Sequence, residues 1–77
     1  MIYIKETFPD DQSVEILVDG MIDCETIPTL DEVCKRNFKA GKRVLLNLQG
    51  IIHISREGKD FLQEIQGGAA IVGYDFL

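Results

Sequence analysis

The segment Arg43–Leu48, RVLLNL, most constrains the fold of this 77-residue chain. Apolar side chains occupy nearly every position after Arg43, whereas a strand with one solvated face alternates apolar and polar residues. The pattern predicts a central strand that is covered on both sides. Because a chain of this length forms a single domain, the remaining elements must assemble their sheet around this strand.

Two alternating segments precede it, at residues 2–8 and 13–20. Apolar residues recur at alternate positions over most of both segments, which predicts strands with one covered face. The intervening PDDQ combines proline with short acidic side chains, so the two strands are expected to form an antiparallel hairpin. The residues expected on the covered faces are Ile2, Ile4 and Phe8 in the first strand and Val14, Ile16 and Val18 in the second.

Two segments have the apolar spacing of helices, one between Thr26 and Gly41 and one over residues 56–66. Thr26 is expected to cap the first helix and Gly41 to end it. Acid-before-base spacing within the first helix predicts two ion pairs at four-residue separation. The pairs expected are Asp31–Lys35 and Glu32–Arg36.

A last short strand is expected at AAIVGY, after Gly67 and Gly68 end the second helix. The predicted order is β-β-α-β-α-β, a single small α/β domain over residues 1–77. A right-handed crossover makes the strands on either side of the first helix parallel, so the four-stranded sheet is mixed, with helices packed on it. Gly50 is expected to interrupt the central strand, after which IIHI carries the chain back towards the sheet edge.

Charge and apolar distribution argue against two classes of partner. A net charge of −5 repels nucleic acid. The cations gathered between Lys35 and Arg43 are explained better by the dipole of a helix C-terminus, which favours positive charge, than by a nucleic-acid-binding patch. No apolar run approaches the roughly 18–20 residues that a membrane span needs, so direct membrane insertion is not expected. The opening MIYIKETF lacks the features of a signal peptide, which leads us to expect a cytoplasmic protein.

Metal and cofactor chemistry is not expected from this sequence. Cys24 and Cys34 match no zinc or redox spacing, and His53 is the single histidine. Cys34 falls on the apolar stripe of the first helix and is expected in the core. The glycines of QGGAA follow a helix instead of preceding one, so they do not form a phosphate-binding loop.

Ser55 precedes the second helix by one residue, the position at which a hydroxyl accepts a hydrogen bond from an unpaired amide. We therefore interpret Ser55 as a helix cap. The alternative is a nucleophile with His53 as its base, because the two side chains share one face of an extended segment. A small hydrolase, or a binder of nucleotides or other small ligands, using Ser55 and His53 is the third functional hypothesis.

Residues 14–30, VEILVDGMIDCETIPTL, resemble the opening of STAS domains, the sulfate-transporter and anti-sigma-factor-antagonist modules. That family has a strand, a glycine, an apolar residue and an aspartate before its first helix. The segment KRVLLNLQGIIHISREGKDFL also resembles the family's central strand and its Asp-Ser-Ser-Gly turn into a helix. The positions that fit the first of these patterns are Gly20, Ile22, Asp23, Thr26 and Leu30.

The regulatory serine of that family does not carry over. When its glycine is laid on Gly58, its aspartate falls on Ser55, its phosphorylated serine on Arg56 and its second serine on Glu57. The resemblance therefore implies STAS architecture without a phosphorylation switch at the usual position. Ser55, one residue early, is the alternative acceptor. A kinase would have to extract it from its capping hydrogen bond.

Family members usually continue into another helix after the fourth strand, whereas this chain ends at GYDFL. Without that helix, Tyr74, Phe76, Leu77 and part of the sheet face are expected to lie open. Exposed apolar area of several hundred Å² usually marks an interface, so these residues are expected to support a homo-oligomer, as a dimer, or contact an obligate partner.

The resemblance implies a non-catalytic, bacterial-type regulatory module that binds a protein, either an anti-sigma-factor kinase-like partner or a transporter subunit. The alternative from another class is a self-assembling orphan domain whose resemblance is limited to the fold. Partner contacts are expected at the start of the second helix and in the VDGMID loop. The candidate residues are Asp19, Asp23, Ser55, Arg56, Glu57, Lys59 and Asp60.

Overall fold

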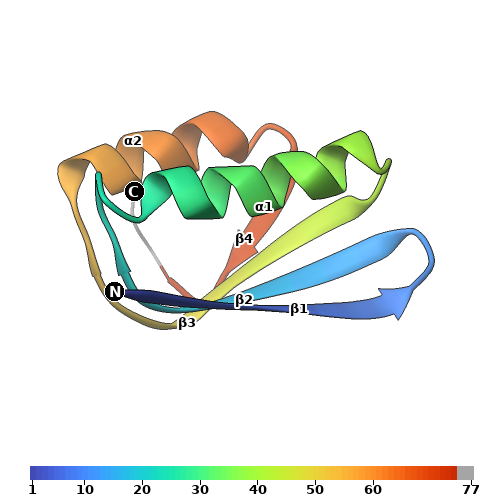
Figure 1. Ribbon diagram of the computed structural model, residues 1–77, viewed down its shortest axis with the longest axis horizontal. Helices are drawn as coiled ribbons and strands as arrows, with labels where there is room; N and C mark the ends of the chain where they lie inside the picture. Colours follow the sequence, from blue (N-terminus) through green and yellow to red (C-terminus); the bar gives the residue numbers. More distant parts are fainter. Residues whose placement is uncertain (75–77) are drawn as a thin grey trace.

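Strands and helices follow one another in the predicted order in a computed structural model of the chain, which describes residues 1–74 (Figure 1). The fold class predicted from the sequence, a small α/β domain with a mixed four-stranded sheet, is confirmed. The elements are β1 (Ile2–Asp10), β2 (Ser13–Ile22), α1 (Ile27–Lys39), β3 (Arg43–Ile54), α2 (Arg56–Ile65) and β4 (Ala69–Val72).

The strands lie in the order β1-β2-β3-β4 across the sheet. β1 and β2 form the predicted antiparallel hairpin, while β2 pairs with β3, and β3 with β4, in parallel. The strand that contains RVLLNL therefore has a neighbour on each side, as its apolar run predicted. Each parallel pair is connected through one helix.

Both helices lie on the same side of the sheet (Figure 1). Each crossover moves one strand further in the same direction, and right-handed connections then place both helices over one face. The prediction that β3 is covered on both sides is therefore wrong. Leu46 is buried beneath the helices, while Leu45 and Asn47 point to the opposite side and are partly exposed. We call this uncovered side the open face.

The core lies between the sheet and the helices. Alternate residues of β2 and β3 enter it, opposite apolar residues from the inner faces of α1 and α2. Cys34 belongs to this cluster, as its position in the helix predicted. The largest fully buried side chains are Val14, Ile16, Val18, Ile22, Leu30, Cys34, Leu46, Leu48 and Leu62.

β3 does not end at Gly50, as the sequence had suggested, but continues to Ile54. Its register with β2 shifts twice, so β3 contains more residues than the part of β2 with which it pairs. Such bulges bend a strand, and Figure 1 shows the ends of β2 and β3 curving towards the starts of the two helices. One consequence is that Ile52 turns outward and is 79% exposed.

The end of the hairpin also departs from regular pairing. The register between β1 and β2 shifts between Thr7 and Asp10, where Pro9 lacks the amide that a ladder would use. Phe8 was expected on the covered face with Ile2 and Ile4. Instead it is 56% exposed, because it lies within this irregular segment, directly after the last regularly paired residue.

One of the two ion pairs predicted within α1 is present. Lys35 Nζ lies 2.9 Å from Asp31 Oδ2. Arg36, however, pairs with Glu6 on β1 instead of Glu32. The other Glu6 oxygen accepts from the buried Asn37 side chain at 3.0 Å, so Glu6 ties α1 to the hairpin.

Candidate functional site

The candidate site lies where β2 and β3 end beside each other and α2 begins. Ile22 pairs with Ile54, and the Ser55 amide donates to the Ile22 carbonyl oxygen at 2.9 Å. Ile22 and Ile54 are both buried, so this end of the sheet is fixed by packing as well as by hydrogen bonding. The first residues of α2 are thus held against the last residue of β2.

Ser55 caps α2, as the sequence predicted. Its hydroxyl oxygen accepts from the Gly58 amide at 3.1 Å, the bond that a serine N-cap makes to the third helical residue. Gly58 is buried, and an added Cβ atom would lie 2.6 Å from the Ile22 carbonyl oxygen. The close approach of α2 to β2 therefore requires glycine at this position.

The turn before α1 is closed by a reciprocal pair of hydrogen bonds. Asp23 Oδ1 accepts from the amides of Glu25 and Thr26, at 3.0 and 3.1 Å, while Thr26 Oγ1 accepts from the Asp23 amide at 2.9 Å. Thr26 occupies the N-cap position of α1, but its side chain does not cap the helix. Its hydroxyl donates to the Met21 carbonyl instead, at 2.9 Å. Asp23 thus orders the turn that leads into α1.

Asp19 lies apart from the other predicted partner-binding residues. It pairs with Gly50 in the sheet, and its carboxylate covers that glycine, whose added Cβ atom would lie 1.6 Å from Asp19 Oδ1. The Asp19 side chain is therefore on the open face, whereas Asp23 and Ser55 lie in the turns beyond the strand ends.

The remaining four predicted residues are exposed on the first turns of α2 and alternate in sign along the chain. Among residues 1–74, none of the four belongs to an ion pair within 4.0 Å or makes a side-chain hydrogen bond. Their charges are therefore free for intermolecular contacts. We call the predicted residues that gather here the junction surface, which comprises Asp23, Ser55, Arg56, Glu57, Lys59 and Asp60.

The Ser55 hydroxyl is not placed as a nucleophile. Its oxygen accepts from Gly58, no hydrogen bond joins it to the exposed His53 within the described chain, and neither residue lines the groove described below. Burial raises the pKa of the Cys34 thiol to about 11, with a smaller contribution from Asp31, so Cys34 stays protonated at neutral pH. In the part of the chain that the structure describes, no group of three or more His, Cys, Asp or Glu residues is arranged to hold a metal ion.

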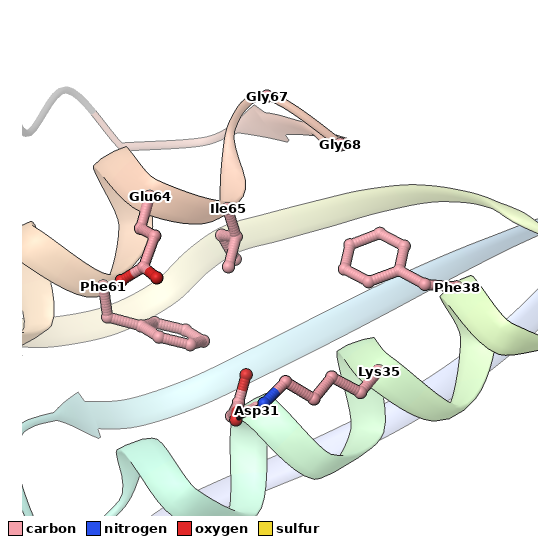
Figure 2. Close-up of a pocket in the computed structure, with 8 residues that line it drawn as sticks. All are labelled: Asp31, Lys35, Phe38, Phe61, Glu64, Ile65, Gly67 and Gly68. Atoms are coloured by element: carbon pink, nitrogen blue, oxygen red, sulfur yellow. Dashed lines mark ion pairs between the residues drawn. The ribbon is translucent and has the colours of Figure 1, made fainter.

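A groove between α1 and α2 was not predicted from the sequence. Its volume is about 320 Å³, and Figure 2 shows Phe38 and Phe61 on opposite sides with Ile65 between them. All three belong to the apolar residues whose spacing predicts the two helices. The spacing of apolar residues predicts which side of a helix is buried, but not whether that side packs against the sheet or against the neighbouring helix. We call this feature the helix groove; its rim and one end are formed by Asp31, Lys35, Glu64, Gly67 and Gly68.

The rim of the helix groove carries charges of both signs. The hydrogen bond that Lys35 donates to Asp31 raises the pKa of Lys35, and the nearby negative charges of Asp31 and Glu64 act in the same direction. Lys35 is paired with Asp31 at 2.9 Å, whereas Glu64 belongs to no ion pair within residues 1–74. The rim therefore has a net charge of about −1, located on the α2 side.

Tyr74 is 38% exposed, while Phe76 and Leu77, the other two residues expected at an oligomer interface, lie outside the described residues. Within residues 1–74, neither helix has the length and apolar character needed to cross a membrane. A scan against models of protein families gave no match, and a search of curated proteins gave no significant match.

Proposed function

We propose that this chain is a STAS-like, non-catalytic interaction module that binds a protein partner through the junction surface. The observation that carries the proposal is that hydrogen bonds hold the start of α2 in place, while the charged side chains on its first turns have no ion partner among the described residues. The Ser55 amide and hydroxyl are both engaged, at 2.9 and 3.1 Å, while Arg56, Glu57, Lys59 and Asp60 are exposed without ion partners in the described chain. Charges of both signs on a fixed backbone favour specific contacts and set their register.

The partner class follows from the resemblance and from the charge of the chain. By resemblance to STAS domains, the partner is an anti-sigma-factor kinase-like protein or a transporter subunit. The net charge of −5 favours a partner that presents a basic patch, since opposite fields accelerate the encounter. Arg56 at the position of the family's phosphorylated serine leads us to propose that binding does not depend on a phosphate there.

Site-specific photo-crosslinking in the native host tests this proposal. A photoreactive amino acid is placed at Lys59 on the junction surface and, as a control, at Lys5, which is exposed on the open face. We expect a specific crosslinked protein from position 59 only. Excess unlabelled wild-type chain should compete for it, whereas a chain carrying Arg56→Glu and Lys59→Glu should not.

Equal capture from both positions, or competition by the double variant, would contradict partner binding at the junction surface. Intact-mass analysis after incubation with the captured partner and ATP tests the absence of a phosphorylation switch. We expect no mass change. A gain of one phosphate mapped to Ser55 would show that the switch has moved by one residue.

The second candidate function is self-assembly, which exposed apolar side chains favour. Tyr3 is 66%, Phe8 56% and Ile52 79% exposed, so large apolar side chains are available for contacts between copies. Sedimentation of the purified chain distinguishes this function, because self-assembly needs no other protein.

A further inference from the structure

We propose that the chain self-associates by inserting the Phe8 side chain of one copy into the helix groove of a second copy. The proposal specifies a contact for the second candidate function, self-assembly, and rests on it. It does not involve the junction surface, so it is tested separately from partner binding.

The inserted group is an aromatic ring with a cation beside it. Phe8 lies at the irregular end of the hairpin and is 56% exposed. Lys42 Nζ lies 5.5 Å from the centroid of the Phe8 ring and donates to the Asp11 carbonyl at 2.8 Å. This hydrogen bond holds the ammonium group close to the ring, within the range of a cation–π interaction. We call Phe8 and Lys42 the hairpin knob.

The helix groove has the size and lining to accept such a ring. Its volume is about 320 Å³, and a cavity of about 150 Å³ is enough to hold benzene. Phe38 and Phe61 face the groove from the two helices, and Ile65 lies between them (Figure 2). A third ring placed there can pack against their edges or faces, which aromatic side chains favour.

The charges of the knob and the groove are complementary. Among residues 1–74 the charge of Lys35 is matched by Asp31, while Glu64 belongs to no ion pair and supplies the net charge of the rim. The groove ends at Gly67 and Gly68, just after the C-terminus of α2, where the helix dipole adds partial negative charge. Lys42 beside Phe8 would therefore approach a negative site. Asp10 and Asp11 follow Phe8 in the hairpin, so the match is between Lys42 itself and the rim, and it requires an orientation in which Lys42 and not these carboxylates faces Glu64.

Sedimentation equilibrium of wild type and knob variants tests the inserted group. We expect a reversible association with a Kd between micromolar and millimolar values. Burying the exposed 56% of Phe8 removes on the order of 100 Å² from water, which corresponds to as much as a hundredfold in affinity. Phe8→Ala should therefore weaken association by at least about tenfold. Tyr3→Ala, which removes an equally exposed aromatic from the open face, should change it less than about twofold.

Variants of the helix groove test the receiving side. A Cβ atom at Gly68 would lie 3.7 Å from the Phe38 ring, in ordinary contact, and the backbone at Gly68 is not left-handed. Gly68→Leu should fill the groove and abolish association, while Gly68→Ala should retain most of it. Glu64→Lys should weaken association more than the same change at Glu32, which is exposed on α1 but does not line the groove.

Mixing the two defective chains provides the decisive measurement. Phe8→Ala and Gly68→Leu should each self-associate at least about tenfold more weakly than wild type. A mixture of the two should form a heterodimer with higher affinity than either chain has for itself, because one chain retains the groove and the other retains the knob. Circular dichroism of each variant confirms that the fold is intact before mixing.

A wild-type chain that remains monomeric at about 1 mM would overturn both self-assembly and this contact. Its Kd would then exceed about 1 mM, which corresponds to a binding free energy weaker than about −4 kcal/mol. Association that survives Phe8→Ala and Gly68→Leu but is lost in Tyr3→Ala would overturn this contact and leave self-assembly standing. Failure of the two defective chains to associate when mixed would also overturn it. None of these outcomes decides whether a partner binds at the junction surface, which the crosslinking experiment at position 59 tests.

Discussion

Gly58→Ala is the substitution for which the structure sets two physical effects against each other. Alanine in place of glycine stabilises a helix interior by about 1 kcal/mol, and by less in the first turn. The added Cβ atom, however, would lie 2.6 Å from the Ile22 carbonyl oxygen and 2.9 Å from an Ile54 methyl group. The first distance is about 0.8 Å shorter than ordinary van der Waals contact.

The Ile22 oxygen cannot move away without a further loss, because it accepts the Ser55 amide at 2.9 Å. A hydrogen bond of this kind contributes about 0.5–1.5 kcal/mol, and overpacking typically costs about 1–3 kcal/mol. The overlap therefore outweighs the gain in helix propensity. We expect Gly58→Ala to lower the free energy of unfolding by about 1–3 kcal/mol, and the midpoint of thermal unfolding by roughly 4–8 °C for each kcal/mol.

Urea denaturation followed by circular dichroism measures this change. The matched control is Gly67→Ala, where a Cβ atom would meet nothing within 4 Å; we expect it to stay within about 0.5 kcal/mol of wild type. A Gly58→Ala chain as stable as wild type, or more stable, would refute the reasoning. It would show that α2 is not pressed against β2 at this point.

Other glycines and one buried thiol yield further predictions. Gly20→Ala should destabilise the chain by more than about 1 kcal/mol, because φ is +104° and the added Cβ atom would lie 2.4 Å from the Met1 carbonyl oxygen. Gly50→Ala should cost less in the same urea assay, although its added Cβ atom would lie only 1.6 Å from Asp19 Oδ1, since the atom met is the end of the exposed Asp19 side chain. For Cys34, the thiol pKa is about 11 in the folded chain against a usual value of 9.0. The unfolded chain loses this proton first, so stability should fall by about 2 kcal/mol between pH 9 and pH 11. A Cys34→Ala chain with the same pH dependence of unfolding would contradict this.

Features set by nearby residues were predicted well from the sequence. The hairpin, the two helices and the central place of RVLLNL each follow from periodicity and turn chemistry within a short segment. The Ser55 cap follows in the same way, because the bond to Gly58 spans three residues. Such features can be predicted without knowing which segments pack against them.

The errors concern relations between segments. The apolar run at Leu45 was interpreted as burial on both sides, but two crossovers in the same direction leave one face uncovered. The continuation of β3 past Gly50, and the exposure of Phe8, result from register shifts that depend on the neighbouring strand. Arg36 has an acidic residue four positions before it and still pairs with Glu6, because the hairpin passes beneath α1. The helix groove likewise exists only once both helices are placed.

The two proposed contacts both involve α2, which bears on how partner binding is regulated. The positive charge of Arg56 interacts unfavourably with the positive end of the helix dipole at the start of α2, and the negative charge of Glu57 interacts favourably with it. The two charges therefore keep the local charge near neutral without a phosphate.

The 10 residues of α2 span only about 15 Å from the junction surface to the end of the helix groove. A protein partner of standard size covers about 800 Å², a patch roughly 30 Å across. If both contacts form as proposed, such a partner overlaps the groove, and a second copy of the chain competes with it. The concentration of the chain itself would then regulate partner binding in the place of a kinase.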